Sequence, residues 1–420
     1  MKDLTKLTDR IFYVGVNDRT KHLFEGLWPL PLGVSYNAYL VCGERTALVD
    51  TVDACFTGRL LANVRERLGD RPLDYLVINH MEPDHSASIA AVRQAYPAVR
   101  IVGNAKTLQM IEGYYGIACG TVEVKEGDVL DLGGLTLAFC MIPMVHWPET
   151  MATWCAEERT IFSGDAFGTF GALNGDVTDE QLDVEPFWEE MRRYYACIVG
   201  KYGQPVQRAL AKVAPLDIAM ICSTHGPVWR REIARVVELY DKVSRYEGEP
   251  GAVIAYGSMY GNTEQMAETV ARGLAAAGVR PIVVYNLSTA DVSQVLRDIF
   301  RYDTLVVGSP TYNGQLYPPV DALLRKIAER CIPHRRFACF GSFTWAGAAV
   351  RRMTEFAEGM KWPVVGYCCG NRQTGFQNHT GGYSGHSLCH HFRRRGSVPS
   401  DRRIHRSIGG LPPALYRLGH

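Results

Sequence analysis

The sequence predicts two α/β domains, the second of them a doubly wound parallel sheet. A chain of 420 residues is too long for one ordinary hydrophobic core and leaves room for a second domain or a third. The first part, to about residue 245, contains short β-like runs punctuated by Gly and Asp. After it, continuous apolar runs alternate with helical patterns, which is typical of a parallel sheet covered on both faces.

The first predicted domain, residues 1–248, has a mixed α/β layer pattern. Its strands are expected at residues 39–41, 46–49, 75–78, 100–102 and 136–139, and helices at residues 58–68 and 87–96. Residues 247–251 read Glu-Gly-Glu-Pro-Gly, which predicts a linker.

The second predicted domain covers residues 252–370. Its strands are expected at residues 252–256, 281–285, 304–308 and 363–367, and helices at residues 264–277 and 292–299. In such a sheet, ligand-binding loops lie at the carboxyl ends of the strands. A final amphipathic helix should follow the last strand, but no helical period is visible there.

Residues 371–420 differ from the rest of the chain in composition. They contain eight Arg, no Lys, one acidic residue and six of the 12 His. We interpret them as an atypical basic tail that is disordered, in preference to a nucleic-acid-binding tail, or as the product of a frame shift near Gly370.

Composition excludes several classes of partner. The formal net charge is +1, which gives no electrostatic reason to expect nucleic acid or membrane partners. The sequence shows neither a signal-peptide pattern nor an apolar run of about 20 residues that could span a bilayer, so a cytoplasmic location is expected. The 12 Cys include no Cys-x-x-Cys pair, which argues against a zinc ribbon or a rubredoxin-type iron site.

Four potential metal ligands lie within six residues, directly after an apolar run. They are His80, Glu82, Asp84 and His85. Imidazole and carboxylate without thiolate suit iron, manganese or zinc. In an extended segment, His80, Glu82 and Asp84 would point to one side, while a turn at Pro83 could redirect the next ligand toward a second metal.

Three later residues could complete the ligand set. His146, Asp165 and His225 are each expected at the end of an apolar strand, before a turn. Taken alone, His146 reads as a partly buried histidine and Asp165 as a turn or cap residue. The cluster at residues 80–85 favours a shared metal site instead.

Three loops of the second domain predict a flavin site. The first lies between a strand and a helix, where small residues let backbone N–H groups approach a phosphate. The other two carry aromatic residues that can flank a flat ring. The absence of Gly-x-Gly-x-x-Gly favours the mononucleotide FMN over a dinucleotide. The predicted flavin-binding residues are Ser258, Met259, Tyr260, Gly261, Asn262, Thr263, Pro310, Thr311, Tyr312, Asn313, Gly314, Ser342, Phe343, Thr344, Trp345 and Ala346.

The pattern His-x-Glu-x-Asp-His at residues 80–85, followed by the three distant ligands, resembles the metallo-β-lactamase superfamily. Its hydrolases usually have His where this chain has Glu82. With that substitution and the flavin loops, residues 5–370 resemble the flavodiiron proteins, as do residues 35–40 and 192–195. The resemblance implies a metallo-β-lactamase-like αββα sandwich followed by a flavodoxin-like doubly wound sheet.

The resemblance also implies a role for each candidate ligand. His80, Glu82 and His146 would hold one iron, and Asp84, His85 and His225 the other. Asp165 would bridge the two. Tyr195 would lie near the substrate pocket as a catalytic residue, although a packed aromatic is an equally good interpretation.

The function implied is that of an oxidoreductase that reduces O2 to water, NO to N2O, or both. FMN would pass it electrons from an external donor, namely rubredoxin, rubredoxin's reductase or a reduced deazaflavin. A head-to-tail homodimer or a dimer of dimers is expected. Two alternatives are a metal-dependent hydrolase with an accessory flavin domain, which Glu82 disfavours, and an electron carrier with a structural metal site.

Overall fold

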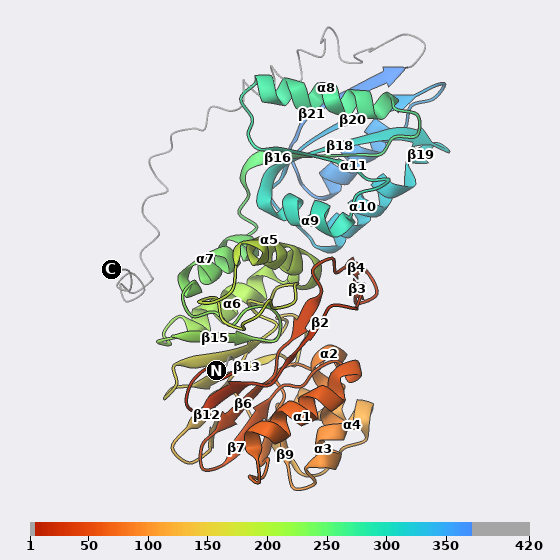
Figure 1. Cartoon of the computed structure of the whole chain (residues 1–420). Coiled ribbons are helices and arrows are strands. Elements are labelled where there is room, and N and C mark those ends of the chain that lie inside the picture. Colours follow the sequence, from red (N-terminus) through yellow and green to blue (C-terminus); the bar gives the residue numbers. More distant parts are fainter. Residues whose placement is uncertain (1–4, 372–420) are drawn as a thin grey trace.

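The computed structural model describes residues 5–371, which form a two-sheet sandwich followed by a separate parallel sheet (Figure 1). The predicted order of the two α/β parts is confirmed. The composition-based interpretation of residues 371–420 falls almost entirely outside the described residues.

The sandwich is built from two mixed sheets that pack face to face. The first sheet has the order β1-β6-β7-β8-β9-β10, with bounds Ile11–Tyr13, Tyr39–Cys42, Thr46–Val49, Tyr75–Val77, Arg100–Gly103 and Thr121–Glu123. The second has the order β11 to β15, with bounds Val129–Asp131, Thr136–Met141, Met151–Cys155, Thr160–Gly164 and Met220–Ser223. Two small hairpin-like pairs lie beside them: β2 (Val16–Asp18) with β5 (Val34–Tyr36), and β3 (Leu23–Phe24) with β4 (Trp28–Pro29).

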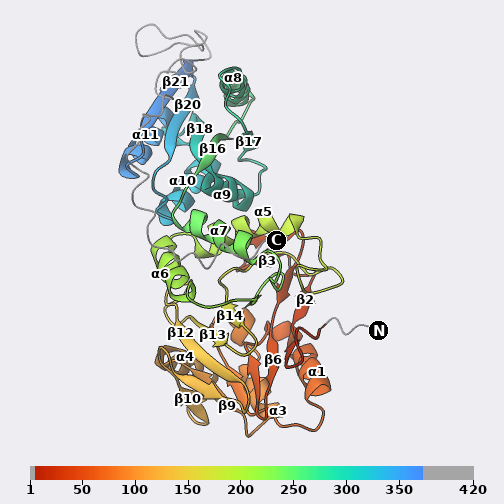
Figure 2. The ribbon, with the colours of Figure 1, turned by 90° about the vertical axis from the view of Figure 1, so that its left-hand side faces the viewer.

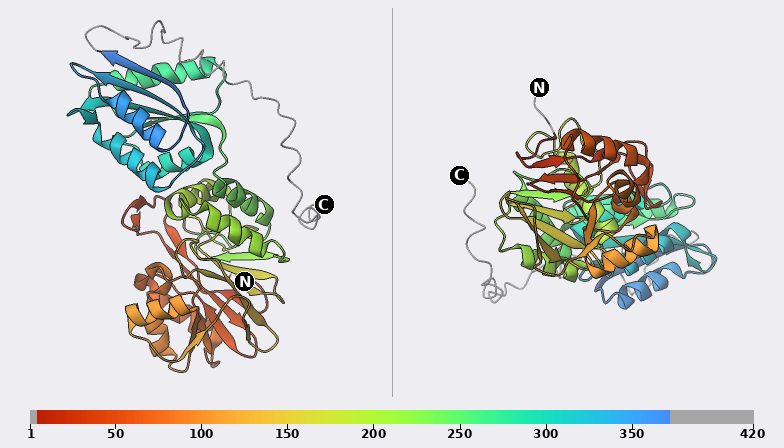
Figure 3. Two further views of the ribbon diagram at one scale, coloured as in Figure 1. Left: turned by 180° about the vertical axis from the view of Figure 1, so that it is seen from behind. Right: turned by 90° about the horizontal axis from the view of Figure 1, so that it is seen from below.

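Helices cover the outer faces of both sheets and complete the αββα layers (Figure 1). The helices next to the first sheet are α1 (Thr57–Leu68), α2 (Pro83–Ser86), α3 (Ile89–Ala95) and α4 (Ala105–Tyr115). Those after β14 are α5 (Glu185–Tyr194), α6 (Gly203–Val213) and α7 (Ile233–Ser244). Figure 3 shows these later, yellow-green helices between the sandwich sheets and the C-terminal sheet.

The C-terminal sheet is parallel and has the order β17-β16-β18-β20-β21. Its strands are β16 (Glu249–Tyr256), β17 (Ile282–Asn286), β18 (Tyr302–Tyr312), β20 (Arg336–Phe343) and β21 (Val364–Asn371), and β19 (Gln315–Leu316) pairs with the end of β18. Its helices are α8 (Asn262–Ala276), α9 (Val292–Arg301), α10 (Pro318–Glu329) and α11 (Ala349–Gly359). This doubly wound order confirms the predicted flavodoxin-like fold.

The two faces of this sheet are covered unequally in the described part of the chain. On one face of the sheet, residues such as Ile254 and Phe340 pack against α8 alone. On the opposite face, Val253 and Leu305 belong to the large core that includes α9, α10 and α11. Figure 2 shows α8 on one side of the sheet and α10 and α11 on the other.

Most element ends lie within a few residues of the predictions, and two differences bear on the sites. β16 begins at Glu249, inside the predicted linker, because Glu249 pairs with Tyr302 at the start of β18. Residues 83–86 form a short helix, with Pro83 in its first turn, where an extended segment was expected. In residues 5–371, no helix is both long and apolar enough to cross a membrane.

Candidate metal centre and flavin site

The sandwich places the cluster at residues 80–85 just after the buried strand β8. His80 follows the strand, Glu82 is the residue that begins α2, and Asp84 and His85 lie in the helix itself. All four residues are at most 8% exposed. The helical turn separates Asp84 and His85 from His80 and Glu82, so the ligands split into two groups, as a turn at Pro83 would require.

The later candidates reach the same edge from other strands. Asp165 follows β14 and His225 follows β15, two parallel neighbours whose carboxyl ends must lie together. His146 differs from its prediction, because β12 ends at Met141 and His146 lies in the loop before β13. The structure nevertheless brings all seven predicted ligands together.

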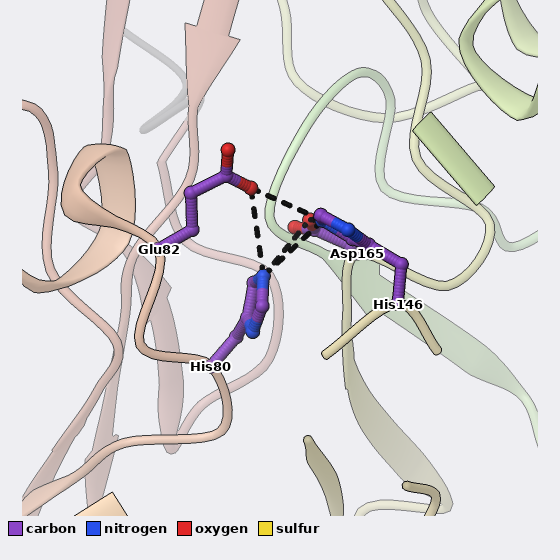
Figure 4. Close-up of side chains that lie close together, drawn as sticks. All are labelled: His80, Glu82, His146 and Asp165. Carbon is purple, nitrogen blue, oxygen red and sulfur yellow. Dashed lines mark hydrogen bonds and ion pairs between the residues drawn. The ribbon is translucent and has the colours of Figure 1, made fainter. Parts of the chain in front are cut away.

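The first group consists of His80, Glu82, His146 and Asp165, whose ligand atoms lie within 4.8 Å of one another (Figure 4). The Nε2 atom of His146 is 3.1 Å from both Glu82 Oε2 and Asp165 Oδ2. The Nε2 atom of His80 is 3.5 Å from Glu82 Oε2 and 3.4 Å from Asp165 Oδ2. Four donor atoms thus converge on one point.

The second group consists of Asp84, His85 and His225. Asp84 Oδ1 lies 3.4 Å from His85 Nε2, and Asp84 Oδ2 lies 3.3 Å from His225 Nε2. Asp165 also faces this group, because its Oδ1 atom is 3.1 Å from His85 Nε2. The two oxygens of Asp165 therefore face different groups, which is the geometry of a bridging carboxylate.

Hydrogen bonds on the far side of two rings fix which nitrogen faces the cluster. His225 Nδ1 lies 2.7 Å from the backbone oxygen of Ser35, an acceptor, so Nδ1 carries the proton in a neutral ring. His80 Nδ1 makes the same kind of bond to Glu149 Oε1 at 2.9 Å. The Nε2 lone pairs therefore point inward, where Nε2 atoms approach each other at 3.3 Å in one group and 3.0 Å in the other. Two imidazole nitrogens this close need a cation between them, a proton in the metal-free protein or a metal ion, so the residues fit two metal ions.

The electrostatics of the cluster also favour bound cations. Burial lowers the pKa of His85, but Asp84 and Asp165 raise it by more, to about 9. His146 behaves alike: hydrogen bonds to Asp165 and Glu82 outweigh burial and raise its pKa to about 9. Burial raises the pKa of Asp165, yet the nearby histidines bring it well below its ordinary value. The clustered carboxylates thus make this buried site favourable for positive charge, and bound metal ions can supply that charge.

Sequence reasoning missed the residues that hold the ligands in place. Glu149 is 1% exposed and accepts hydrogen bonds from His80 Nδ1 and from the backbone N–H of Met81, at 2.9 and 3.0 Å. Thr224 donates its hydroxyl to Asp165 Oδ1. Both residues lie within three positions of a predicted ligand, and that proximity was the only signal available.

The structure does not bring Tyr195 to the cluster. Its ring packs against Tyr240 and Phe300, with centroids 5.3 and 6.1 Å away. Its neighbour Tyr194 lies by the cluster instead, 5.5 Å from the His225 ring. Tyr194 is the last residue of α5, and Tyr195 is the first of the π-helical turn Tyr195–Val199 that continues it. Successive helical residues point about 100° apart, so a shift of one position moves the side chain to another face.

The predicted flavin residues lie at the carboxyl ends of three adjacent strands, β16, β18 and β20. Hydrogen bonds join the three segments. The hydroxyls of Thr263 and Ser342 lie 2.9 Å apart, and Thr311 Oγ1 accepts from the backbone N–H groups of Ala348 and Ala349. Part of the predicted second loop is strand, because β18 continues to Tyr312 and turns into β19 at Asn313 and Gly314. The third loop likewise begins within β20, which ends at Phe343.

The first segment fits a phosphate group. Gly261 has a φ of +85° and begins α8, and no side chain caps the N–H groups of that helix's first turn. These N–H groups and the helix dipole form an anion site. Tyr260 and Trp345 on the flanking loops are 83% and 90% exposed, which leaves their ring faces available to a flat ligand.

The profile of the ODP family beta lactamases matches residues 34–226, and that of flavodoxin matches residues 254–379. A nitric oxide reductase of Moorella thermoacetica is 32% identical over 369 residues, which is 87% of this chain and 92% of that protein. An anaerobic nitric oxide reductase flavorubredoxin of Escherichia coli is 32% identical over 82% of this chain and 73% of its own length. The solved rubredoxin oxygen:oxidoreductase of Desulfovibrio gigas superposes with a TM-score of 0.86 at 29% identity, covering 93% of this chain and 96% of that one.

The sandwich with two facing ligand groups, joined to a flavodoxin-like sheet, defines a class of protein that combines a dinuclear metal centre with a flavin. Within that class, the chain belongs to the flavodiiron protein family, since the match to its relatives extends over both domains. The cofactors of this family are FMN and two non-haem iron ions.

Proposed function

We propose that this flavodiiron protein reduces O2 to water, NO to N2O, or both, with electrons delivered through FMN. The observation that carries the proposal is the placement of the Asp165 carboxylate between two histidine-rich ligand groups. Relatives similar over most of both chains are a nitric oxide reductase and a rubredoxin:oxygen oxidoreductase, which supports both gases as substrates.

His80, Glu82 and His146 would hold one iron, Asp84, His85 and His225 the other, and Asp165 both. Two bound ferrous ions would supply two electrons and a shared place for a diatomic ligand, and FMN would supply further electrons. Glu82 favours iron, because a carboxylate is a harder ligand than the imidazole usual in the zinc hydrolases. The alternative of a hydrolase with an accessory flavin domain has no comparable support.

Aromatic side chains would keep water from the centre. Phe24 and Tyr194 lie against the His225 ring, with centroids 5.4 and 5.5 Å away, and Trp147 lies 5.3 Å from the His80 ring. Electrostatic interactions strengthen when water is excluded, so this apolar wall would strengthen the hold of the carboxylates on cations.

We infer that the electron donor is rubredoxin, its reductase or a reduced deazaflavin, in keeping with the rubredoxin named in two of the relatives. A head-to-tail homodimer, alone or as a dimer of dimers, would bring the exposed Tyr260 and Trp345 of one subunit toward the metal centre of another. The absence of a spanning helix in residues 5–371 accords with a cytoplasmic place of action. We place the domain boundary at Gly248, directly before β16.

Anaerobic reconstitution with ferrous iron and FMN tests the proposal. We expect two iron ions and one FMN per chain, and consumption of O2 and of NO at an electrode when a reduced rubredoxin is supplied. Protein that holds two zinc ions, or holds iron and FMN but consumes neither gas, would contradict it. Light scattering of the same sample measures the oligomeric state.

A further inference from the structure

A small cavity of about 20 Å³ lies between the second sheet of the sandwich and helix α6. Ala152 of β13 and Ile161 of β14 form one wall, and Ala209 and Leu210 of α6 form the opposite wall. Tyr240 of α7 closes a further side. The cavity is separate from the residues that face the metals.

The lining is apolar. Two lining residues, Ser163 and Tyr240, have a polar group in the side chain. The Ser163 hydroxyl donates to the backbone oxygen of Ala166 at 2.7 Å. No polar atom of the lining residues is exposed to the cavity. A trapped water needs about two to four polar partners, so this cavity favours staying dry.

The size of the cavity suits one small molecule. A cavity of roughly 10–15 Å³ holds one water-sized particle, and dry apolar cavities bind apolar guests such as xenon. A molecule of two atoms with almost no dipole therefore fits both its volume and its polarity.

The cavity lies directly behind two loops that carry predicted metal ligands. Val145 lines it and precedes His146, while Ala166 lines it and follows Asp165. The side chains of His146 and Asp165 lie with the other ligands, and their chain neighbours Val145 and Ala166 line the cavity. The cavity wall and the metal centre therefore share these two loops.

We propose that this cavity is a binding site for an apolar diatomic gas, which it holds next to the metal centre and supplies to it. The proposal rests on the proposed function for the identity of the gas as O2 or NO. Binding of the gas in the cavity depends only on the cavity's size and polarity.

Xenon-pressurised crystals of the iron- and FMN-loaded protein test the site directly. We expect xenon between β13 and α6 in the unaltered protein. Ala209→Leu should fill the cavity from the helix side and abolish the xenon peak. Ala211→Leu is the matched control, because Ala211 lies two residues along the same helix and is exposed. Ala152→Val fills the cavity from the sheet side, should α6 not tolerate leucine.

The filled variants should raise the apparent KM for the gas about threefold or more, with kcat unchanged, because gas then reaches the metal centre more slowly while the steps after its arrival are unaltered. Water in the cavity, no xenon in the unaltered protein, or an unchanged KM in a folded variant that excludes xenon would overturn the proposal. Failure of the proposed function would appear differently, as absence of gas reduction in protein that still binds xenon.

Discussion

Glu82 sets the character of the metal centre at the scale of single residues. Its Oε2 atom lies 3.1 Å from His146 Nε2, within the first ligand group. The choice of a carboxylate at this place changes which metal the pocket favours without changing the fold around it. The residues behind the ligands matter as well, since they fix the ring nitrogens that face the metals.

Glu149 provides a test of that second layer. Glu149→Ala should weaken metal binding about 10- to 100-fold, because His80 loses the partner that fixes its Nδ1 proton. The metal affinity of Glu149→Gln should lie between those of Glu149→Ala and the unaltered protein, since the amide oxygen of Gln can still accept both hydrogen bonds. Titration of the apoprotein with Co²⁺, followed by its visible absorption, measures the affinity. Glu123→Gln, at an exposed site, is the control. Equal affinity for Co²⁺ in Glu149→Ala and in this control would refute the role of Glu149 in orienting His80.

Metal affinity should rise with pH. In the metal-free protein, His85 and His146 have a pKa of about 9, so both hold protons at pH 7. A metal must displace those protons, and raising the pH toward 9 removes this competition. The apparent affinity for Co²⁺ should increase roughly tenfold per pH unit for each proton displaced. Calorimetric titrations between pH 6 and 9 measure it, and a flat profile would be inconsistent with the raised pKa values.

At the scale of elements, each site is built from the ends of strands. β14 and β15 run parallel and bring Asp165 and His225 to one edge, and β16, β18 and β20 do the same for the flavin segments. Parallel strands place their carboxyl ends together, so residues far apart in sequence become neighbours.

The start of α8 is the element whose conformation should control FMN binding. Gly261 has a φ of +85°, which costs a residue with a Cβ about 1–2 kcal/mol. Gly261→Ala should weaken FMN about fivefold or more, as the strained loop moves its N–H groups away from the phosphate. Quenching of FMN fluorescence on titration with apoprotein measures this. Gly359→Ala, at the end of α11 with open space around it, should leave affinity unchanged.

At the scale of the whole molecule, buried arginines connect the sandwich to the parallel sheet. Arg193 of α5 donates to Ser293 of α9, and Arg330 donates to the backbone oxygen of Ala196. Arg335, only 1% exposed, donates to the backbone oxygens of Tyr246, Ile299 and Phe300. These contacts fix the orientation of the two domains.

Arg335→Met should therefore destabilise the protein. The change removes the Arg335 donor from two buried backbone oxygens, those of Ile299 and Phe300, at about 1–3 kcal/mol each. Removal of a buried charge, whose pKa burial lowers to about 10, offsets this in part. We expect the free energy of unfolding to fall by about 3 kcal/mol, measured by urea denaturation. Arg325→Met is the control, because its pair with Asp321 is exposed and contributes about 0–1 kcal/mol. Equal stability of the two variants would contradict the proposed role.

The sequence by itself determined the local chemistry: which strands are buried, which loops carry imidazole, carboxylate or glycine, and that Glu82 replaces a usual histidine. These features depend on periodicity and on neighbours in the chain. It could not distinguish Tyr194 from Tyr195, because a helix face is decided by packing across α5. It could not find Glu149 as the partner of His80, or the cavity behind Asp165, because those contacts join residues from different strands. Only the tertiary structure decides such neighbours, since close packing brings them together irrespective of their separation along the chain.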